Sequence, residues 1–269
     1  MAQQQPENGW QEEKVRAAGA DFSVVKGPQS GKPLLVLHDE LGYPGWFKWH
    51  SALAPDHTLI IPGHPGFGRT PRLEWISDVR DLASAYARFV REQGLAPIDV
   101  IGFSLGGWLA AEMAVADPGL FRRMVLVAPT GVRPPQGEIM DLYNYSVRNY
   151  LKAGVPDWEH NAEFSNLFGG PQDTLELIEM WEDARSETAR IAWRPYMYSD
   201  SLPFRLAGIA SVPTLLIWGS EDQIVPPSSG ETYKSAIPGS KLVVMRGVGH
   251  HPEIERPTEF VEQLQNFLR

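Results

Sequence analysis

The stretch from Gly102 to Gly107 reads Gly-Phe-Ser-Leu-Gly-Gly, between an apolar run at 98–101 and a helical pattern at 108–116. A strand that turns sharply into a helix, with a serine at the apex, is the arrangement of a nucleophile elbow. Glycines two residues before and after the serine let strand and helix pass close together, while the hydroxyl stays accessible. The stretch therefore predicts nucleophilic catalysis by Ser104.

The partners of Ser104 have to support this interpretation, because the pattern Gly-x-Ser-x-Gly also occurs in turns without catalytic meaning. A serine hydroxyl is a poor nucleophile at neutral pH and needs a histidine base that a carboxylate orients. Asp222 follows the apolar run 213–218, and His250 follows the apolar run 242–245. Open α/β sheets place their active sites at the carboxyl ends of parallel strands. The order Ser104, Asp222, His250 therefore predicts a catalytic triad.

Short apolar runs alternate with helical patterns along most of the chain, at 34–37, 58–61, 98–102, 124–127, 214–218 and 242–245. This alternation predicts a doubly wound, mostly parallel α/β sheet with helices on both faces. We expect residues 20–25 to form an edge strand and residues 1–12 a loose leader. The alternation stops after residue 130 in a helical, aromatic-rich segment. We predict a core formed by 1–130 and 206–269 and a helical cap at 131–205.

These motifs resemble the α/β-hydrolase superfamily, in the branch that holds esterases, lactonases, carbon–carbon bond hydrolases and perhydrolases. The resemblance covers nearly the whole chain and rests on Leu34–His38, Pro62–Thr70, the nucleophile turn, Trp218–Asp222 and Gly249-His250. It implies an α/β-hydrolase fold with the cap insertion over the nucleophile. It also implies an oxyanion hole formed by the backbone N–H groups of Leu105 and Glu40.

The loop after Leu37 departs from the family pattern, in which His-Gly is usual. Here His38 is followed by Asp39 and Glu40. Backbone donors leave an oxyanion hole possible, but a carboxylate beside an oxyanion would oppose its charge. We therefore expect both acidic side chains to point away from the site. The alternative interpretation of the loop is a solvated turn that only begins a helix.

His251 adjoins His250 and is the alternative base, but the family pattern of glycine, histidine, any residue and proline assigns the role to His250. We expect substrate contacts from Asp39, Phe103, Trp193 and His251. The other histidines lack the spacing of a metal site, and the chain has no cysteine. We therefore expect no metal and no cofactor.

The formal net charge of -9 and the absence of a lysine–arginine cluster argue against nucleic-acid binding. The lack of cysteine excludes a disulfide framework and fits a reducing compartment. No signal-peptide pattern and no apolar run of membrane length occur. We expect a cytoplasmic protein without a membrane partner that acts on a small, largely apolar carbonyl compound. The sequence leaves the oligomeric state open.

The expected reaction is hydrolysis of a carboxylic ester or lactone through an acyl-enzyme. A carbon–carbon bond hydrolase of meta-cleavage-type diketones is an alternative, with Arg190 or Arg194 as candidates to bind a substrate carboxylate. Such enzymes usually carry tryptophan after the catalytic histidine, where this chain has His251. A perhydrolase and a non-catalytic ligand-binding protein are the further alternatives. Haloalkane dehalogenases and epoxide hydrolases are disfavoured, because their nucleophile is an aspartate.

Overall fold

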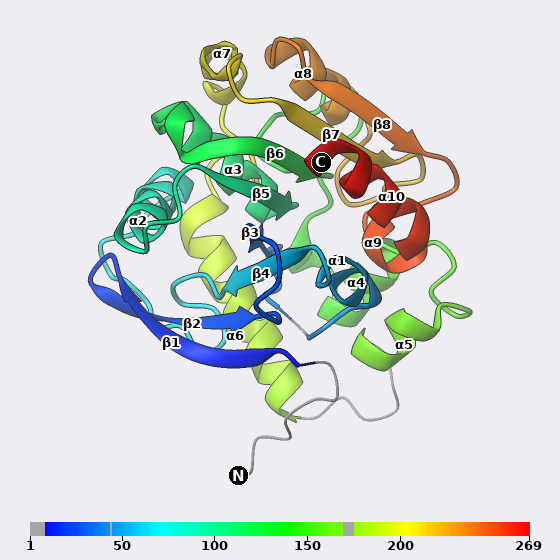
Figure 1. Cartoon of the computed structure of the whole chain (residues 1–269). Helices are drawn as coiled ribbons and strands as arrows, with labels where there is room; N and C mark the ends of the chain where they lie inside the picture. Colours follow the sequence, from blue (N-terminus) through cyan, green and yellow to red (C-terminus); the bar gives the residue numbers. More distant parts are fainter. Residues whose placement is uncertain (1–8, 44, 169–174) are drawn as a thin grey trace.

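The computed structural model describes residues 9–43, 45–168 and 175–269, and it is built around an eight-stranded sheet (Figure 1). The strand order is β1-β2-β4-β3-β5-β6-β7-β8. Neighbours from β4 to β8 are parallel, whereas β2 is antiparallel to both β1 and β4. The strands are β1 Gln11–Ala17, β2 Ala20–Lys26, β3 Lys32–Leu37, β4 His57–Pro62, β5 Ile98–Phe103, β6 Phe121–Val127, β7 Thr214–Gly219 and β8 Lys241–Met245.

Helices cover both faces of this sheet, which explains why its central strands are continuous apolar runs. Figure 1 shows α10 in front of the sheet and α3 behind it. The helix α1 packs against α10, and α2 packs against α3. The doubly wound, mostly parallel sheet predicted from the sequence is confirmed. The core helices are α1 Lys48–Leu53, α2 Val79–Glu92, α3 Leu105–Ala116, α8 Ser228–Ala236, α9 Pro252–Glu255 and α10 Pro257–Leu268.

The amino-terminal hairpin corrects one prediction. Residues 11–12 belong to β1 and not to a loose leader, and β1 rather than β2 is the edge strand; residues 1–8 lie outside the described ranges. The β1 strand is mostly polar and buries only Val15 and Ala17, so its own sequence carries little strand signal. Its turn has positive φ at Ala18 and Gly19, a conformation usually marked by asparagine or aspartate before glycine.

The segment between β6 and β7 is helical, as predicted for the cap. Its two ends meet, because residue 131 forms a bridge with residue 198. Arg205, at the end of α7 Leu202–Arg205, donates two hydrogen bonds of 2.6 Å to the buried Glu112 carboxylate of α3, which fixes this end to the core. The division into core and cap domains stays a prediction. The helices are η2 Leu142–Asn144, α4 Val147–Ala153, α5 Ala162–Phe168, α6 Leu175–Ala192, α7 Leu202–Arg205 and, after it, η3 Leu206–Ile209.

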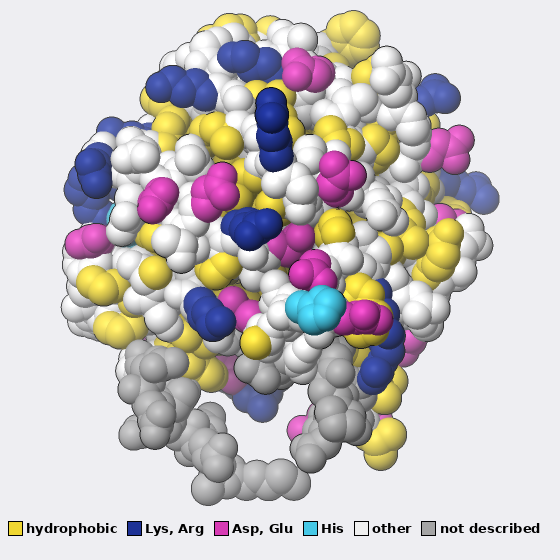
Figure 2. Space-filling model, turned by 90° about the vertical axis from the view of Figure 1, so that its right-hand side faces the viewer, with side chains coloured by type: hydrophobic (Ala, Val, Ile, Leu, Met, Phe, Trp, Pro, Cys, Tyr) yellow, Lys and Arg dark blue, Asp and Glu magenta, His cyan; other side chains and the backbone are white. Residues whose placement is uncertain are grey.

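The surface carries acidic and basic side chains in a mixed distribution on the face shown in Figure 2. Hydrophobic side chains lie among them in scattered groups. Within the described ranges, every helix is too short or too polar to cross a membrane.

Candidate active site

Steric fit shapes the turn that carries Ser104. The residue joins β5 to α3 with a φ of +46°, and its N–H donates to Val127 O at 3.0 Å. A Cβ on Gly102 would lie 2.3 Å from Gly106 O, and a Cβ on Gly106 would lie 2.3 Å from Leu37 O. Glycine is therefore required at both positions, because any side chain would collide with backbone. The turn matches the strand–turn–helix predicted from the sequence.

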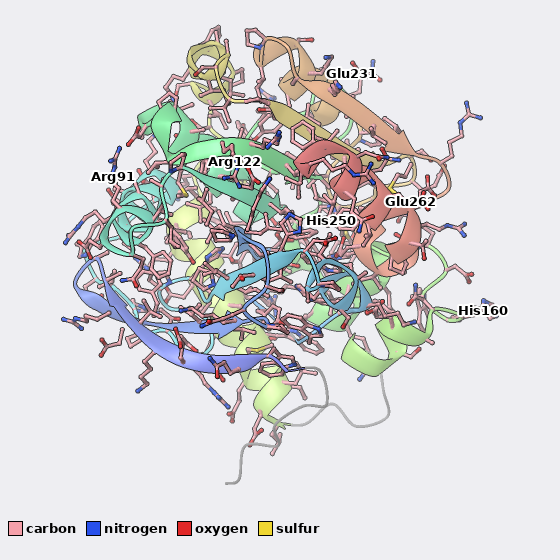
Figure 3. All side chains as sticks on the ribbon, in the orientation of Figure 1. Arg91, Arg122, His160, Glu231, His250 and Glu262 are labelled. Carbon is pink, nitrogen blue, oxygen red and sulfur yellow. The ribbon has the colours of Figure 1, made fainter. Side chains whose placement is uncertain are left out.

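Asp222 and His250 lie together in the interior, where Figure 3 shows His250. The Asp222 Oδ1 atom accepts the N–H groups of Ile224 and Val225, each at 2.9 Å. Its Oδ2 lies 2.8 Å from Nδ1 of His250. Burial alone would lower the pKa of His250, but the charge of Asp222 and this hydrogen bond outweigh burial and raise the pKa. Nδ1 thus carries the proton that faces Asp222, and Nε2 is left for other chemistry.

The backbone of the histidine loop is tied to the predicted cap. The His250 N–H donates to the carbonyl of Gly154, just after α4, at 2.7 Å. A Cβ on the preceding Gly249 would lie 2.5 Å from the same oxygen and 2.5 Å from Cδ of Pro156. The two segments therefore touch backbone to backbone, and glycine at 249 makes this approach possible.

The Ser104 hydroxyl completes the predicted set of three residues, but it is not hydrogen-bonded to His250. Ser104 is 1% exposed, and its Oγ has no hydrogen-bond partner of good geometry among the described residues. Hydrogen bonds of this kind are commonly long before substrate binds and tighten in the reacting complex. In the structure, the hydrogen bond between Asp222 and His250 is therefore already formed, and Ser104 lies at the apex of its turn.

Two stacked histidines anchor the start of the loop after β3. The His38 ring lies 3.6 Å from the His64 ring, measured between centroids. Its Nδ1 bonds Asp39 O at 2.8 Å, and its Nε2 accepts the His64 N–H at 2.9 Å. Burial lowers the pKa of His38 to about 4, so the ring is neutral, as an accepting Nε2 requires. The sequence showed only that these histidines lack metal-site spacing, and it contained no signal for their pairing.

The Glu40 side chain points into the site, so the expectation that it points away is wrong. Glu40 is 2% exposed, and its Oε1 accepts the Tyr150 hydroxyl of α4 at 2.6 Å. Its backbone carbonyl accepts the Thr188 hydroxyl of α6 at 2.9 Å. These partners lie more than a hundred residues away in sequence, and they hold the side chain in place despite the repulsion that it would exert on an oxyanion.

The Glu40 carboxylate also faces the predicted catalytic groups. Burial alone would raise the pKa of Glu40, but the charge of His250 and the Tyr150 and Ser104 hydroxyls outweigh burial and lower it. Glu40 Oε2 nevertheless has no hydrogen bond of good geometry among the described residues. An ionised carboxylate with a bare oxygen therefore lies beside Ser104.

Asp39, Phe103 and His251, three of the predicted substrate contacts, line one small cavity of about 30 Å³. The Asp39 Oδ1 accepts the Leu41 N–H at 2.9 Å, and burial together with the charge of Glu40 raises the pKa of Asp39 to about 7. Nδ1 of His251 lies 3.0 Å from Oε1 of Glu253. Burial opposes this pair, but Glu253 outweighs it and raises the pKa of His251 to about 9. A role in substrate binding stays a prediction for all three.

Trp193, the fourth predicted contact, is 44% exposed and lies in an aromatic cluster of the predicted cap. Its ring centroid lies 5.0 Å from that of Tyr143 and 5.8 Å from that of Tyr196. No ring or hydrogen-bond contact joins it to Ser104, Asp222 or His250 in the part of the chain that the structure describes. Its role in substrate binding stays a prediction.

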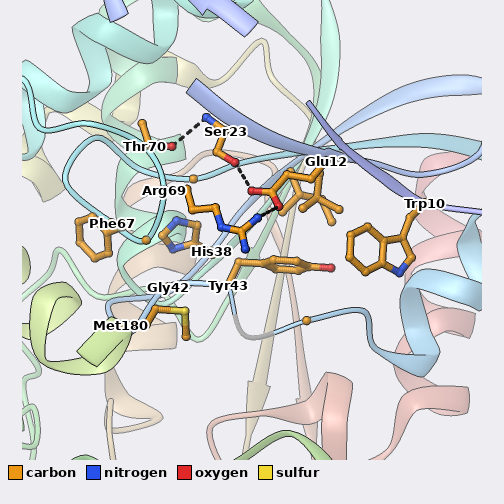
Figure 4. A pocket seen from close by; sticks show the side chains of 15 residues that line it. Trp10, Glu12, Ser23, His38, Gly42, Tyr43, Phe67, Arg69, Thr70 and Met180 are labelled. Atoms are coloured by element: carbon orange, nitrogen blue, oxygen red, sulfur yellow. Dashed lines mark hydrogen bonds and ion pairs between the residues drawn. The ribbon is translucent and has the colours of Figure 1, made fainter. Parts of the chain in front are cut away.

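A surface pocket of about 260 Å³ lies next to the loop that follows β3 (Figure 4). It shares His38, Gly42 and Tyr43 with the small cavity, and Met180 of α6 lies at its edge. Its polar wall is the ion pair between Arg69 and Glu12. Ser104, Asp222 and His250 are not among its lining residues. Over the described ranges, no group of three or more metal-ligating side chains has the geometry to hold a metal ion.

Comparison with known proteins gives consistent matches. A family model described as the alpha/beta hydrolase family matches residues 34–263. The chain is 27% identical over 256 residues to 2-hydroxymuconate semialdehyde hydrolase of Pseudomonas sp. strain CF600, which covers 89% of this chain and 87% of the relative. It is 25% identical to pimeloyl-acyl-carrier protein methyl ester esterase of Yersinia pseudotuberculosis, over 87% of this chain and 92% of the relative. The crystal structure of naproxen esterase from Bacillus subtilis has a TM-score of 0.78 over 98% of this chain and 93% of that chain, and at 19% identity it shows the fold alone.

Proposed function

Because the chain belongs to the alpha/beta hydrolase family, we propose that it is a serine hydrolase that cleaves a carboxylic ester or a lactone through an acyl-enzyme. The observation that carries the proposal is the 2.8 Å hydrogen bond between Asp222 and His250, together with Ser104 on its strained turn. His250 Nε2 takes the Ser104 proton as Oγ attacks the carbonyl carbon. Asp222 holds the imidazole in place and stabilises its charged form.

Two backbone N–H groups complete the proposed mechanism. The Leu105 N–H begins α3 and has no acceptor among the described residues, so it is available to an oxyanion. The Glu40 N–H is the second proposed donor. His250 then returns its proton to the leaving alkoxide, and the alcohol departs. Water, deprotonated by His250, attacks the acyl-enzyme and releases the acid and the free serine.

The cap at 131–205 is part of the proposal, because it supplies the groups that close over the oxyanion loop. Tyr150 of α4 and Thr188 of α6 both bond Glu40. With Ser104 only 1% exposed, substrate reaches the serine when these contacts open. Exclusion of water from the closed site would strengthen the electrostatic interactions that act on the transition state.

A carbon–carbon bond hydrolase is the second candidate, and the relative from Pseudomonas supports it. Charge argues against a substrate with a carboxylate near the reacting carbon. Arg190 is occupied, because it bonds Glu187 and the carbonyl of Ile76. The buried Glu40 carboxylate would repel an anionic group beside Ser104. Ester or lactone hydrolysis is therefore our first proposal.

Intact-mass spectrometry after treatment with a fluorophosphonate tests the proposal directly. We expect one adduct on the wild-type protein and none on Ser104→Ala, because only an activated serine is phosphonylated. A panel of aryl esters, lactones and meta-cleavage-type diketones then separates the two candidates. Equal labelling of both proteins would remove Ser104 as the nucleophile. No labelling of either would mean that the cap blocks Ser104 or that the oxyanion loop is defective, and it would favour a binding protein.

A further inference from the structure

One oxygen of the buried Glu40 carboxylate lacks a partner. Tyr150 holds Oε1 at 2.6 Å, whereas Oε2 is buried without a hydrogen bond of good geometry from any described residue. A buried carboxylate oxygen left bare is costly, and such groups are normally paired. The neighbouring Ser104 Oγ is bare as well. The Ser104 hydroxyl lies close enough to lower the pKa of Glu40, but it makes no hydrogen bond of good geometry and, in the proposed reaction, gives its proton to His250. A substrate group can therefore be the donor to Oε2.

The charges around Glu40 favour a positively charged donor. The charge of Asp39 acts on Glu40, Asp222 bonds His250, and Glu253 bonds His251. His251, whose pKa is raised to about 9, is a cation at neutral pH, and Glu253 is its partner. A substrate cation here would meet a net negative surrounding in a region shielded from water, where charge interactions are strong.

The position of Glu40 limits where such a cation would sit on the substrate. Under the proposed function, the backbone N–H of Glu40 donates to the carbonyl oxygen of the scissile group. The carboxylate of the same residue reaches Ser104, whose Oγ attacks the carbonyl carbon. We therefore place a group bound by Oε2 on the carbon next to that carbonyl.

We propose that the Glu40 carboxylate is a subsite for a protonated amine on the carbon next to the scissile carbonyl, so that the substrates are esters or lactones of amino acids. The proposal rests on the proposed function. Tyr150 is a positioning residue in it, because its hydroxyl fixes Oε1 and leaves Oε2 directed at the substrate. The bound ammonium donates to Oε2 and supplies the missing partner.

This arrangement also resolves the conflict between Glu40 and the oxyanion. A bare carboxylate would oppose the negative charge that develops on the carbonyl oxygen. A substrate ammonium beside it cancels that charge, so the oxyanion is opposed only when a substrate without the cation is bound. Selectivity then comes from a repulsive element as well as from an attractive one.

Three p-nitrophenyl esters with one carbon skeleton test the proposal. The esters of phenylalanine, phenyllactic acid and hydrocinnamic acid carry an amine, a hydroxyl and a hydrogen on the carbon next to the carbonyl. The assay is run at a pH below the pKa of the amine, so that the amine is protonated. We expect the wild-type protein to favour the phenylalanine ester over the hydrocinnamic ester in kcat/KM by roughly tenfold to a hundredfold, the worth of a charge-assisted hydrogen bond. In Glu40→Gln the preference falls, because the amino ester becomes slower and the hydrocinnamic ester faster. The matched control Glu163→Gln, which alters another buried cap-side carboxylate, keeps the wild-type ratio.

Equal use of the phenyllactic and phenylalanine esters would overturn the proposal in favour of a neutral donor. A wild-type protein without preference, or a Glu40→Gln ratio like the wild type, would overturn it outright while leaving ester hydrolysis intact. Failure of the proposed function would give a different result, because the wild type would then hydrolyse no ester faster than Ser104→Ala does. In that event, calorimetry compares the binding of phenethylammonium and phenethyl alcohol to Ser104→Ala. Tighter binding of the ammonium, and loss of that difference in the double variant Ser104→Ala/Glu40→Gln, would support the subsite. Equal binding of the two probes would reject it.

Discussion

The two loops that flank the proposed oxyanion hole are built in opposite ways. The turn at 102–107 is shaped by close backbone contacts that only glycine permits, and it contains no titratable side chain. The loop at 38–42 is shaped by buried polar groups, two of which reach it from α4 and α6. The first loop is held by neighbouring core backbone, whereas the second takes hydrogen-bond partners from helices of the predicted cap. Changes on each side should therefore fail in different ways, and the predictions below use that contrast.

The largest effect is expected on the nucleophile side, from Asp222→Asn. The change keeps the shape of the side chain but favours the wrong histidine tautomer, and the expected loss in kcat is about ten-thousandfold. Steady-state kinetics on the best ester measure it. The neighbouring exposed residue provides the control, since Glu221→Gln should leave kcat unchanged. A loss below tenfold for Asp222→Asn would remove Asp222 from the mechanism.

Gly106→Ala should damage the fold rather than the chemistry alone. The added Cβ would lie 2.3 Å from Leu37 O and 2.4 Å from His38 O, so backbone must move. We expect the free energy of unfolding to fall by about 1–3 kcal/mol or more, measured by denaturant titration. Gly208→Ala is the matched change, because nothing lies within 4 Å of its added Cβ. Equal stability of the two variants would contradict a turn determined by steric contact.

Tyr150→Phe tests the opposite side of the comparison. Loss of the hydroxyl removes the donor to Oε1 of the buried Glu40 carboxylate, so neither oxygen then has a hydrogen bond of good geometry from a described side chain. We expect the free energy of unfolding to fall by about 1–3 kcal/mol. The pKa of Glu40 should rise, since a hydrogen bond to its charged form is gone. Thermal unfolding over a pH series measures both effects. The exposed Tyr145→Phe serves as control, and a Tyr150→Phe protein as stable as that control would show that Glu40 does not depend on the cap.

The last prediction concerns pH and the charge of His251, which acts on Asp39 and Glu40 of the loop at 38–42. The pKa of His251 is raised from 6.5 to about 9 in the folded protein, so its contribution to stability is full below pH 6.5. That contribution is lost as the pH rises through about 9. We expect stability to decline across this window in the wild type and to decline less in His251→Gln. Parallel pH profiles for the two proteins would rule out His251 as the source.

The contrast between the loops also explains what the sequence could predict. Motifs set by local geometry were readable: glycines around Ser104, and apolar strands that end before Asp222 and His250. The β1 strand was missed because a polar edge strand acquires its conformation from its partner β2. The orientation of Glu40 was wrong for a similar reason, since Tyr150 and its partner share no sequence pattern. Pairings between distant polar groups leave no periodic signal in one sequence.

The backbone contact between Gly154 and His250 has a consequence for protein engineering. A helical segment inserted after β6, as at 131–205, suggests a unit that could be exchanged to alter the substrate range. In this chain, an exchanged lid would also have to reproduce the path of residues 154–156 against Gly249, or the imidazole would lose its anchor. The predicted lid and His250 are thus coupled through the backbone, and grafts that retain the 154–156 segment should preserve turnover where complete replacements lose it.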